Sequence, residues 1–254
     1  MISEQFALRV TLRRDIVDDF SRYPFSLPIV RSLESIDLHP KVTFFVGENG
    51  SGKSTLLEAI AVALGFNAEG GSRNFRFSNR ESHSDLHDYL RIAKGIKRPR
   101  TGYFLRAESF FNVATEIEEL DAEPSLGPPI IASYGGRSLH EQSHGESFIT
   151  LLTERFGEQG LYVLDEPEAA LSPQRQLVAL SRLHQLANEK CQFIIATHSP
   201  ILMAYPDAWI YECSANGMKR IDYDDIEHVQ VMRNFLADPQ RMLRVLMEEN
   251  PQTD

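Results

Sequence analysis

A glycine-rich stretch in the first quarter of the chain has the residue types and spacing of a phosphate-binding loop. Its members are Gly47, Glu48, Asn49, Gly50, Ser51, Gly52, Lys53, Ser54 and Thr55. It follows the β-branched and aromatic run 42–46 and precedes apolar residues at helical spacing, which is the context that the motif requires. In such a loop backbone N–H groups surround the phosphates, Lys53 reaches the β and γ oxygens, Ser54 ligates Mg²⁺ and Thr55 donates to the α-phosphate. The stretch therefore predicts a nucleoside triphosphate site rather than a glycine turn that only caps a helix.

Two later apolar runs end in polar residues that suit the same chemistry. Asp165 and Glu166 follow the run 161–164, and His198 comes shortly after the run 193–196. Because the carboxyl ends of parallel strands meet at one edge of a sheet, these side chains are expected to face one pocket. Asp165 would hold Mg²⁺, Glu166 would orient or deprotonate the attacking water, and His198 would donate to the γ-phosphate. The alternatives, an acidic strand end in solvent and a structural histidine, fit less well beside a phosphate loop.

The elements that must position these residues follow from the apolar pattern. Strands that alternate with helices predict an α/β fold with a mostly parallel central sheet flanked by helices. One helix is expected to begin at Ser172, as N-cap, and Pro173. Its expected apolar stripe consists of Leu177, Leu180, Leu183 and Leu186. An Asn-Gly pair at Asn216 indicates a hairpin between the runs 209–213 and 218–221.

The domain organisation is predicted to be a single domain over residues 1–254. Residues 67–128 differ from the rest, with glycines, polar residues and mixed charge, and they are interpreted as an insertion beside the sheet. With the segment that follows, the inserted or helical subdomain is placed at about 67–150. This division depends on composition rather than on a sharp boundary signal.

Composition and charge limit the class of protein. The chain has 254 residues, 42% of them apolar, and a net charge of −10. These values are ordinary for a globular protein, and neither a spanning apolar run nor a signal pattern is present, so we expect a cytoplasmic protein without membrane insertion. The acidic balance argues against indiscriminate coating of nucleic acid. However, the segment Arg91 to Arg106 carries six cations and no acid, so it could follow a nucleic-acid backbone or form a solvated face.

Three stretches together resemble the ABC-type ATPases, in the branch that includes the SMC, RecF and OLD-like proteins. They are the loop 47–55, the run 165–173, which reads Asp-Glu-Pro-Glu-Ala-Ala-Leu-Ser-Pro, and the run 196–200, which reads Ala-Thr-His-Ser-Pro. The resemblance implies an ABC-like P-loop fold with an inserted subdomain, ATP and Mg²⁺ as cofactors, and ATP hydrolysis. The chain looks like a small stand-alone bacterial ATPase. The resemblance covers about two thirds of the chain.

The family also carries a signature loop, and the best match lies about twenty residues before Asp165. The candidate residues are Ser143, Gly145 and Glu146. Compared with the usual Leu-Ser-Gly-Gly-Gln, Gln142 replaces the leucine, His144 a glycine and Glu146 the glutamine, and glutamate at that last position also resembles the SMC branch. In the family this loop contacts the ATP of a second subunit, so the resemblance implies a head-to-tail homodimer around two ATP molecules. A polar helix cap is the alternative interpretation.

Other positions depart from the family pattern. No glutamine lies between Ser54 and Gln142, where the family carries one at a strand end; Arg106 and Glu108 are the candidates to replace it. Ser172 stands where the family usually has aspartate. Tyr23 or Phe25 could serve as a platform for adenine, or both could be core residues.

Three functions remain open at this point. The first is an ATP hydrolase that dimerises around ATP and drives an unidentified partner, in DNA repair or defence. The second is the nucleotide-binding subunit of an ABC transporter, which the Pro-Glu and Ser-Pro variants of the motifs disfavour. The third is a non-hydrolysing, ATP-dependent clamp, which retention of Glu166 disfavours. The sequence identifies neither the biological pathway nor the partner protein, and it does not distinguish a preference for ATP from one for GTP.

Overall fold

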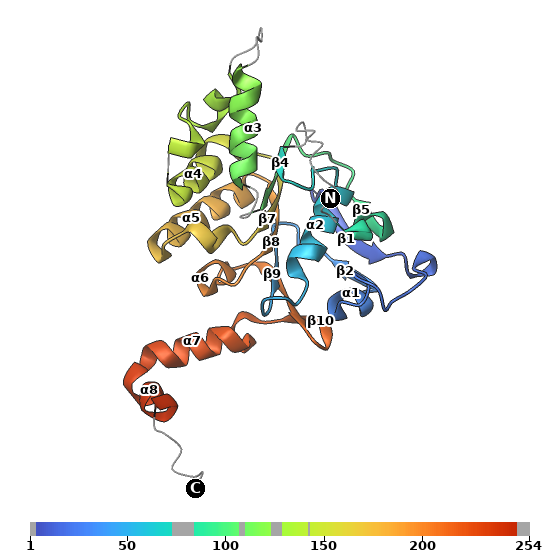
Figure 1. The fold of residues 1–254 in the computed structure, drawn as a ribbon, viewed down its shortest axis with the longest axis vertical. Helices are drawn as coiled ribbons and strands as arrows, with labels where there is room; N and C mark the ends of the chain where they lie inside the picture. Colours follow the sequence, from blue (N-terminus) through green and yellow to red (C-terminus); the bar gives the residue numbers. More distant parts are fainter. Residues whose placement is uncertain (1–3, 73–83, 107–109, 123–128, 142, 248–254) are drawn as a thin grey trace.

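The computed structural model describes residues 4–72, 84–106, 110–122, 129–141 and 143–247 (Figure 1). Two sheets form its framework. The larger has seven strands in the order β10-β9-β3-β8-β7-β6-β4, and the smaller has three in the order β2-β1-β5. The strands are β1 (Ala7–Leu12), β2 (Ser35–Asp37), β3 (Val42–Val46), β4 (Gly71–Ser72), β5 (Leu90–Lys94), β6 (Thr101–Arg106), β7 (Gly160–Asp165), β8 (Gln192–Ala196), β9 (Ala208–Ser214) and β10 (Gly217–Ile221).

The mostly parallel central sheet predicted from the sequence is confirmed. Strands β9, β3, β8, β7 and β6 run parallel, while β10 and β4 pair antiparallel at the two edges. Every residue of β3, β7 and β8 is buried, because helices or the second sheet cover both faces. The carboxyl ends of these three strands consequently lie side by side at one edge.

Helices cover the two faces of the central sheet. The helices are α1 (Pro28–Arg31), α2 (Lys53–Ala63), α3 (Phe110–Ala122), α4 (His144–Thr150), α5 (Pro173–Asn188), α6 (Pro200–Met203), α7 (Glu227–Ala237) and α8 (Pro239–Met247). Val42 and Phe44 of β3 belong to the core formed with α3, α4 and α5, whereas Phe45 belongs to the core formed with α2 and β1. This alternation is the period of two that a strand between two layers requires. Figure 1 shows the helical groups on opposite sides of the sheet.

The range 67–150 contributes to several parts of the fold. Its strand β6 is an interior member of the central sheet, paired with β7 on one side and with β4 on the other. Its strand β5 pairs with β1 in the small antiparallel sheet. Only α3 and α4, with the turns between them, form a helical group beside α5 (Figure 1). The assignment of this range to a separate subdomain stays a prediction.

Two local predictions can be compared with the structure. Helix α5 begins as expected, since Ser172 accepts a hydrogen bond from Arg175 N and Pro173 is the first helical residue. The predicted stripe is wrong at Leu177, which is 57% exposed. The buried face is instead formed by Ala179, Leu183, Leu186 and Ala187.

The hairpin at the sheet edge is confirmed, with Ser214 of β9 paired to Gly217 of β10. Beyond it, α7 and α8 extend from the body of the molecule as an arm (Figure 1). Several apolar side chains of the arm are exposed: Val231, Met232, Leu236, Leu243, Val245, Leu246 and Met247. Among the described residues, no helix has the length and apolar character that membrane crossing demands.

Candidate nucleotide-binding site

The glycine-rich loop joins β3 to α2 in a conformation that glycine makes possible. Gly47, Gly50 and Gly52 have φ values of 143°, 78° and 95°. All three φ values are positive, in a region of backbone conformation that residues with a Cβ rarely adopt. At Gly47 a Cβ would also lie 2.1 Å from the carbonyl oxygen of Cys213 in β9. The loop can therefore turn its backbone N–H groups inward while lying directly against the neighbouring strand.

Lys53, the first residue of α2, is held within this loop. Its Nζ donates to the carbonyl oxygens of Gly47 at 2.9 Å and Glu48 at 2.8 Å. The residue is 4% exposed, and this burial lowers the pKa of the ammonium group, while nearby acidic groups, among them Glu166 and Asp165, act in the opposite direction. The geometry gives the loop one buried cation at its mouth, which suits a phosphate ligand.

The predicted metal ligands come together across two elements. Ser54 Oγ of α2 donates to Asp165 Oδ1 at the end of β7 over 3.0 Å. Asp165 is 7% exposed, so its carboxylate is fixed by the sheet rather than by solvent. A hydroxyl and a carboxylate at this separation fit Mg²⁺, which takes one or two protein oxygens and keeps its other positions for water and phosphate. Among the described residues, no group of three or more His, Cys, Asp or Glu side chains could hold a metal by itself.

Glu166 adopts an unusual backbone conformation at the end of β7. Its φ and ψ are 48° and 51°, in the left-handed region, and its N–H donates to Ala196 O of β8 over 2.9 Å. Its carboxylate is 40% exposed. A non-glycine residue in this region costs of order 1–3 kcal/mol, and such strain concentrates at functional sites. The turn presents a solvated carboxylate directly beside the buried Asp165.

The predicted switch histidine lies beside Glu166. His198 Nε2 is 3.6 Å from Glu166 Oε1. Burial is the main cause that lowers the pKa of His198, and the charge of Lys53 adds to it. The imidazole is therefore uncharged at neutral pH, so the contact with Glu166 is not an ion pair. His198 also lines a hollow of about 540 Å³ together with loop residues that include Gly47 and Ser51.

Sequence reasoning missed one carboxyl side chain at this edge. Glu168, two residues after Glu166, accepts the backbone N–H of His198 on Oε1 at 2.5 Å. Burial raises the pKa of Glu168, against the effect of the His198 hydrogen bond. The side chain therefore connects the end of β7 to the segment after β8. The two glutamates on either side of Pro167 are visible in the sequence. The hydrogen-bond partner of Glu168, the His198 N–H, lies 30 residues further along the chain.

The candidate signature residues form the start of α4. Ser143 caps the helix, and Glu146 returns a hydrogen bond to the Ser143 N–H over 3.1 Å, which completes a capping box. Arg175 of α5 donates to Ser143 Oγ and Glu146 Oε1, each at 3.3 Å. A Cβ on Gly145 would lie 2.7 Å from Ala170 O, so the glycine permits close contact with the segment after Glu166.

This segment faces a different surface from the phosphate loop. Glu146 and Arg175 line a hollow of about 1040 Å³. None of the described residues around that hollow also lines the hollow at the phosphate loop. The structure thus brings Asp165, Glu166 and His198 to the loop, whereas Glu146 lines a separate hollow.

Three residues with less defined expectations have clear positions. Arg106, at the end of β6, forms an ion pair with Glu58 of α2 over 2.7 Å, with side chains 19% and 10% exposed. Glu108 lies outside the described residues. Phe25 is a fully buried core residue, whereas Tyr23 is 61% exposed and its hydroxyl lies 3.2 Å from Thr55 Oγ1. Tyr23 is thus the aromatic side chain available beside the loop.

The basic segment Arg91 to Arg106 is partly neutralised. Three of its cations form ion pairs: Lys97 with Glu4, Arg100 with Glu158, and Arg106 with Glu58. The remaining cations, Arg91, Lys94 and Arg98, have no ion pair with a described residue. Three of the six positive charges of this segment are therefore balanced by acidic partners, so a ligand would not meet the full charge of +6.

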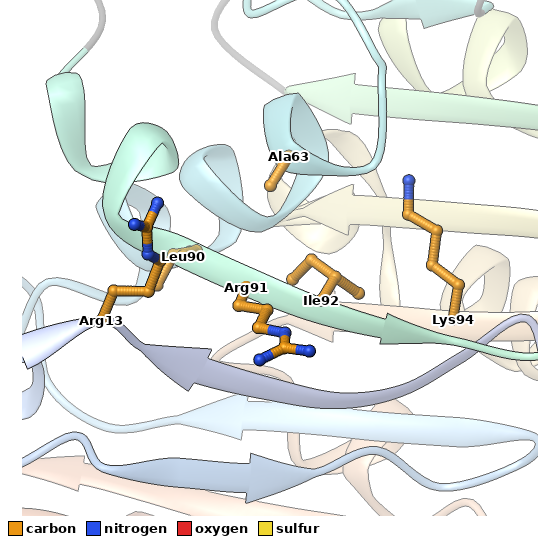
Figure 2. A pocket seen from close by; sticks show the side chains of 6 residues that line it. All are labelled: Arg13, Ala63, Leu90, Arg91, Ile92 and Lys94. Carbon is orange, nitrogen blue, oxygen red and sulfur yellow. The ribbon is translucent and has the colours of Figure 1, made fainter.

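Two of these cations, Arg91 and Lys94, belong to the edge strand β5. Arg13, Arg91 and Lys94 line a hollow of about 510 Å³ whose floor includes Ile92 and Ala63. Figure 2 shows Arg91 and Lys94 extending from opposite sides of β5, as the alternation of a strand requires. Nucleic-acid contact by this surface stays a prediction.

Comparison with protein families supports the assignment of the loop and of the sheet edge. Residues 25–120 match a family described as "AAA domain", and this range contains the phosphate loop. Residues 133–204 match a family described as "AAA domain, putative AbiEii toxin, Type IV TA system", and this range contains Asp165, Glu166 and His198.

Individual relatives agree with these matches. The chain is 69% identical over 32 residues to the DNA replication and repair protein RecF of Colwellia psychrerythraea. This aligned segment covers 12% of this chain and 8% of that protein. It is 37% identical over 84 residues to RecF of Actinobacillus pleuropneumoniae, which is 28% of this chain and 22% of that protein. The chain therefore spans less than a quarter of the length of these curated relatives.

Solved structures reproduce the fold. An ATP-binding cassette of an ABC transporter superposes with a TM-score of 0.50 at 17% identity, covering 96% of this chain and 99% of that chain. At this identity the likeness concerns the fold alone. Together with the geometry of the loop and the two matched AAA segments, it shows an AAA-type P-loop ATPase whose fold resembles that of the ABC cassettes, consistent with the branch that contains the SMC, RecF and OLD-like proteins.

Proposed function

We propose that this protein binds ATP with Mg²⁺, hydrolyses it, and dimerises around it to drive a partner. The observation that carries the proposal is the convergence at one sheet edge of the loop cation Lys53, the Ser54–Asp165 pair at 3.0 Å and the exposed carboxylate of Glu166. Phosphoryl transfer to water needs a phosphate cradle, a metal site and a positioned nucleophile, and little else from the protein.

The residues of the chain divide this work. Backbone N–H groups of the loop and the Lys53 ammonium bind the phosphates, and Thr55 contacts the α-phosphate beside Tyr23. Mg²⁺ held by Ser54 and Asp165 would neutralise charge on the β and γ oxygens. Glu166, strained and solvated, orients the attacking water and accepts its proton. His198, uncharged because burial lowers its pKa, donates from its imidazole to the γ-phosphate.

The candidate signature supports a head-to-tail homodimer. Glu146 lines a different hollow from the one at the phosphate loop, which supports contact of Ser143, Gly145 and Glu146 with the ATP of a second copy. Two copies related by a twofold axis would then enclose two ATP molecules.

The cellular role follows from the relatives rather than from the site. RecF proteins are named for DNA replication and repair, and one matched family is described by a toxin of a toxin–antitoxin system. We therefore infer a partner in DNA repair or defence and a cytoplasmic location. A transporter subunit or a non-hydrolysing clamp is less consistent with the exposed carboxylate and the match to RecF.

Phosphate release tests the proposal directly. We expect slow, Mg²⁺-dependent phosphate release from ATP by the full chain, with a fluorescent ATP analogue reporting binding. Lys53→Ala removes the loop cation and should abolish both signals. Binding by the wild type without release above the Lys53→Ala background would contradict hydrolysis and favour the clamp. A comparison of ATP with GTP in the same assay establishes the nucleotide preference.

A further inference from the structure

The segment after β8 that carries the predicted switch histidine is held by hydrogen bonds from three different elements. Thr197 N–H donates to a carbonyl oxygen of β3 over 3.1 Å. His198 N–H donates to Glu168 Oε1, in the turn after β7, over 2.5 Å. Ser199 Oγ donates to Gln176 Oε1 of α5 over 2.6 Å. Of these three bonds, the one that ends on His198 itself comes from Glu168.

Glu168 and the proposed water-orienting carboxylate extend from the same short turn, Pro167–Ala170 with Glu166 before it. The N–H of Glu166 donates to Ala196 O at the end of β8 over 2.9 Å. The turn is therefore joined to the segment after β8 twice, through main chain at Glu166 and through a side chain at Glu168. The His198 ring in turn lies beside Glu166, with Nε2 3.6 Å from Oε1. One turn thus supplies both the carboxylate and the hold on the switch.

A carboxyl group at residue 168 costs the fold free energy. Glu168 is partly buried, and this burial raises its pKa because the charged form loses water. An apolar side chain of the same length would avoid that cost. It would also leave the His198 N–H without its acceptor, and an unpaired buried donor is itself unfavourable. What distinguishes glutamate here is an acceptor oxygen that reaches the switch segment.

We propose that Glu168 is a positioning residue for the switch histidine. Its side chain holds the main chain of His198, so that the imidazole stays beside Glu166 and can donate to a γ-phosphate oxygen. This inference deepens the proposed function and rests on it. The role depends on the reach of the side chain and on an acceptor oxygen, whereas the role of Glu166 as a base depends on charge.

Three substitutions at residue 168 of the full chain separate reach from charge. Glu168→Gln keeps an acceptor oxygen at the same reach and removes the charge. Glu168→Asp keeps the charge, but the loss of one methylene group withdraws the acceptor from the His198 N–H. Glu168→Met keeps the length and has no oxygen. Gln176→Met is the matched control, because it removes a side-chain acceptor from the same segment at Ser199 and leaves the bond to His198 in place.

The measurements are kcat/KM for phosphate release and the affinities for ADP and for a non-hydrolysable ATP analogue, all with Mg²⁺. Glu168→Asp and Glu168→Met should lower kcat/KM and the affinity for the analogue by about three- to tenfold, the equivalent of one hydrogen bond. Their affinity for ADP should change less than about twofold, because ADP has no γ-phosphate for the switch to contact. Glu168→Gln and Gln176→Met should stay within about twofold of the wild type in all three quantities.

Other patterns would overturn the proposal. Losses in Glu168→Gln with wild-type values in Glu168→Asp would show that charge matters and reach does not. Equal losses in Gln176→Met and Glu168→Met would show a general loosening of the segment. An equal loss of affinity for ADP and for the analogue would place the damage at the phosphate loop instead of the switch.

The two affinities also separate this proposal from the proposed function. If the wild type releases no phosphate, hydrolysis fails, and the preference for the analogue over ADP still tests the positioning of His198. A preference that is absent in the wild type, or unchanged in Glu168→Asp and Glu168→Met, would refute it. Urea denaturation checks that each variant is folded, and if Glu168→Met is not, the contrast between Glu168→Asp and Glu168→Gln decides.

Discussion

Glu166 and Glu168 are two residues apart and have opposite surroundings, so replacing each by its amide separates catalysis from folding. Glu166 is 40% exposed, and its contact with the uncharged His198 imidazole is 3.6 Å long. We therefore expect Glu166→Gln to change the free energy of unfolding by less than about 0.5 kcal/mol, as surface substitutions do. Loss of a general base typically slows a reaction by about 10²–10⁴-fold, so kcat should fall by that factor. This corresponds to about 3–5 kcal/mol in the barrier.

The matched variant Glu168→Gln should behave differently. Burial raises the pKa of Glu168, so the folded protein holds a proton there more tightly than the unfolded chain does. The wild type therefore gains stability as the pH falls from the raised pKa toward the ordinary value of 4.5, and above that window the buried carboxylate costs stability. Glutamine keeps an oxygen for the His198 N–H and carries no charge. Glu168→Gln should be at least as stable as the wild type at neutral pH, with a difference that shrinks across this window.

Three measurements are made on the same preparations. Urea denaturation at several pH values gives the free energy of unfolding, an ATP titration gives the affinity, and phosphate release gives kcat. Glu166→Gln should bind ATP normally, and Glu168→Gln should retain most of its kcat. The reasoning is refuted if Glu166→Gln loses more than about 1 kcal/mol of stability. It is equally refuted if Glu168→Gln loses turnover as severely as Glu166→Gln, because the assignment of roles to the two carboxyl groups would then be wrong.

Further predictions concern the loop, a buried ion pair and the basic surface. Gly47→Ala should lose more than about 2 kcal/mol in thermal denaturation, because its Cβ would lie 2.1 Å from Cys213 O at a φ of 143°; unchanged stability would contradict the loop geometry. Arg106→Met should cost about 3–5 kcal/mol by leaving the buried Glu58 without its cation, and a second substitution, Glu58→Met, should recover much of the loss. Additive losses in that cycle would argue against coupling. Arg91→Glu should weaken binding to double-stranded DNA and reduce the slope of its salt dependence, whereas equal binding would identify a solvated face.

The local motifs of the fold could be predicted from the sequence. The phosphate loop and the strand and helix around it were predicted because glycine spacing and apolar runs encode them within about fifteen residues. The same holds for the apolar strands that end at Asp165 and at Ala196, and for the Ser172 cap of α5. Because parallel strands share an edge, their order along the chain also indicated which side chains would meet.

Contacts between distant segments could not be predicted in this way. The small sheet joins β1 to β5 across about eighty residues, and β5 lies in a range whose composition suggested an insertion. Glu168 meets His198 through a separation that no motif records. Leu177 fitted an apolar stripe, but the face that packs is formed by Ala179, Leu183, Leu186 and Ala187.

The ATP-bound dimer is the central claim, and light scattering after size-exclusion chromatography tests it most directly. Glu166→Gln should trap ATP. With ATP and Mg²⁺ its mass should therefore be twice the 28.8 kDa of one chain, and without nucleotide its mass should be that of one chain. Adding Ser143→Arg should abolish the dimer while leaving ATP binding intact, because arginine would block the signature surface. A Glu166→Gln protein that binds ATP and still elutes with the mass of one chain would contradict the account.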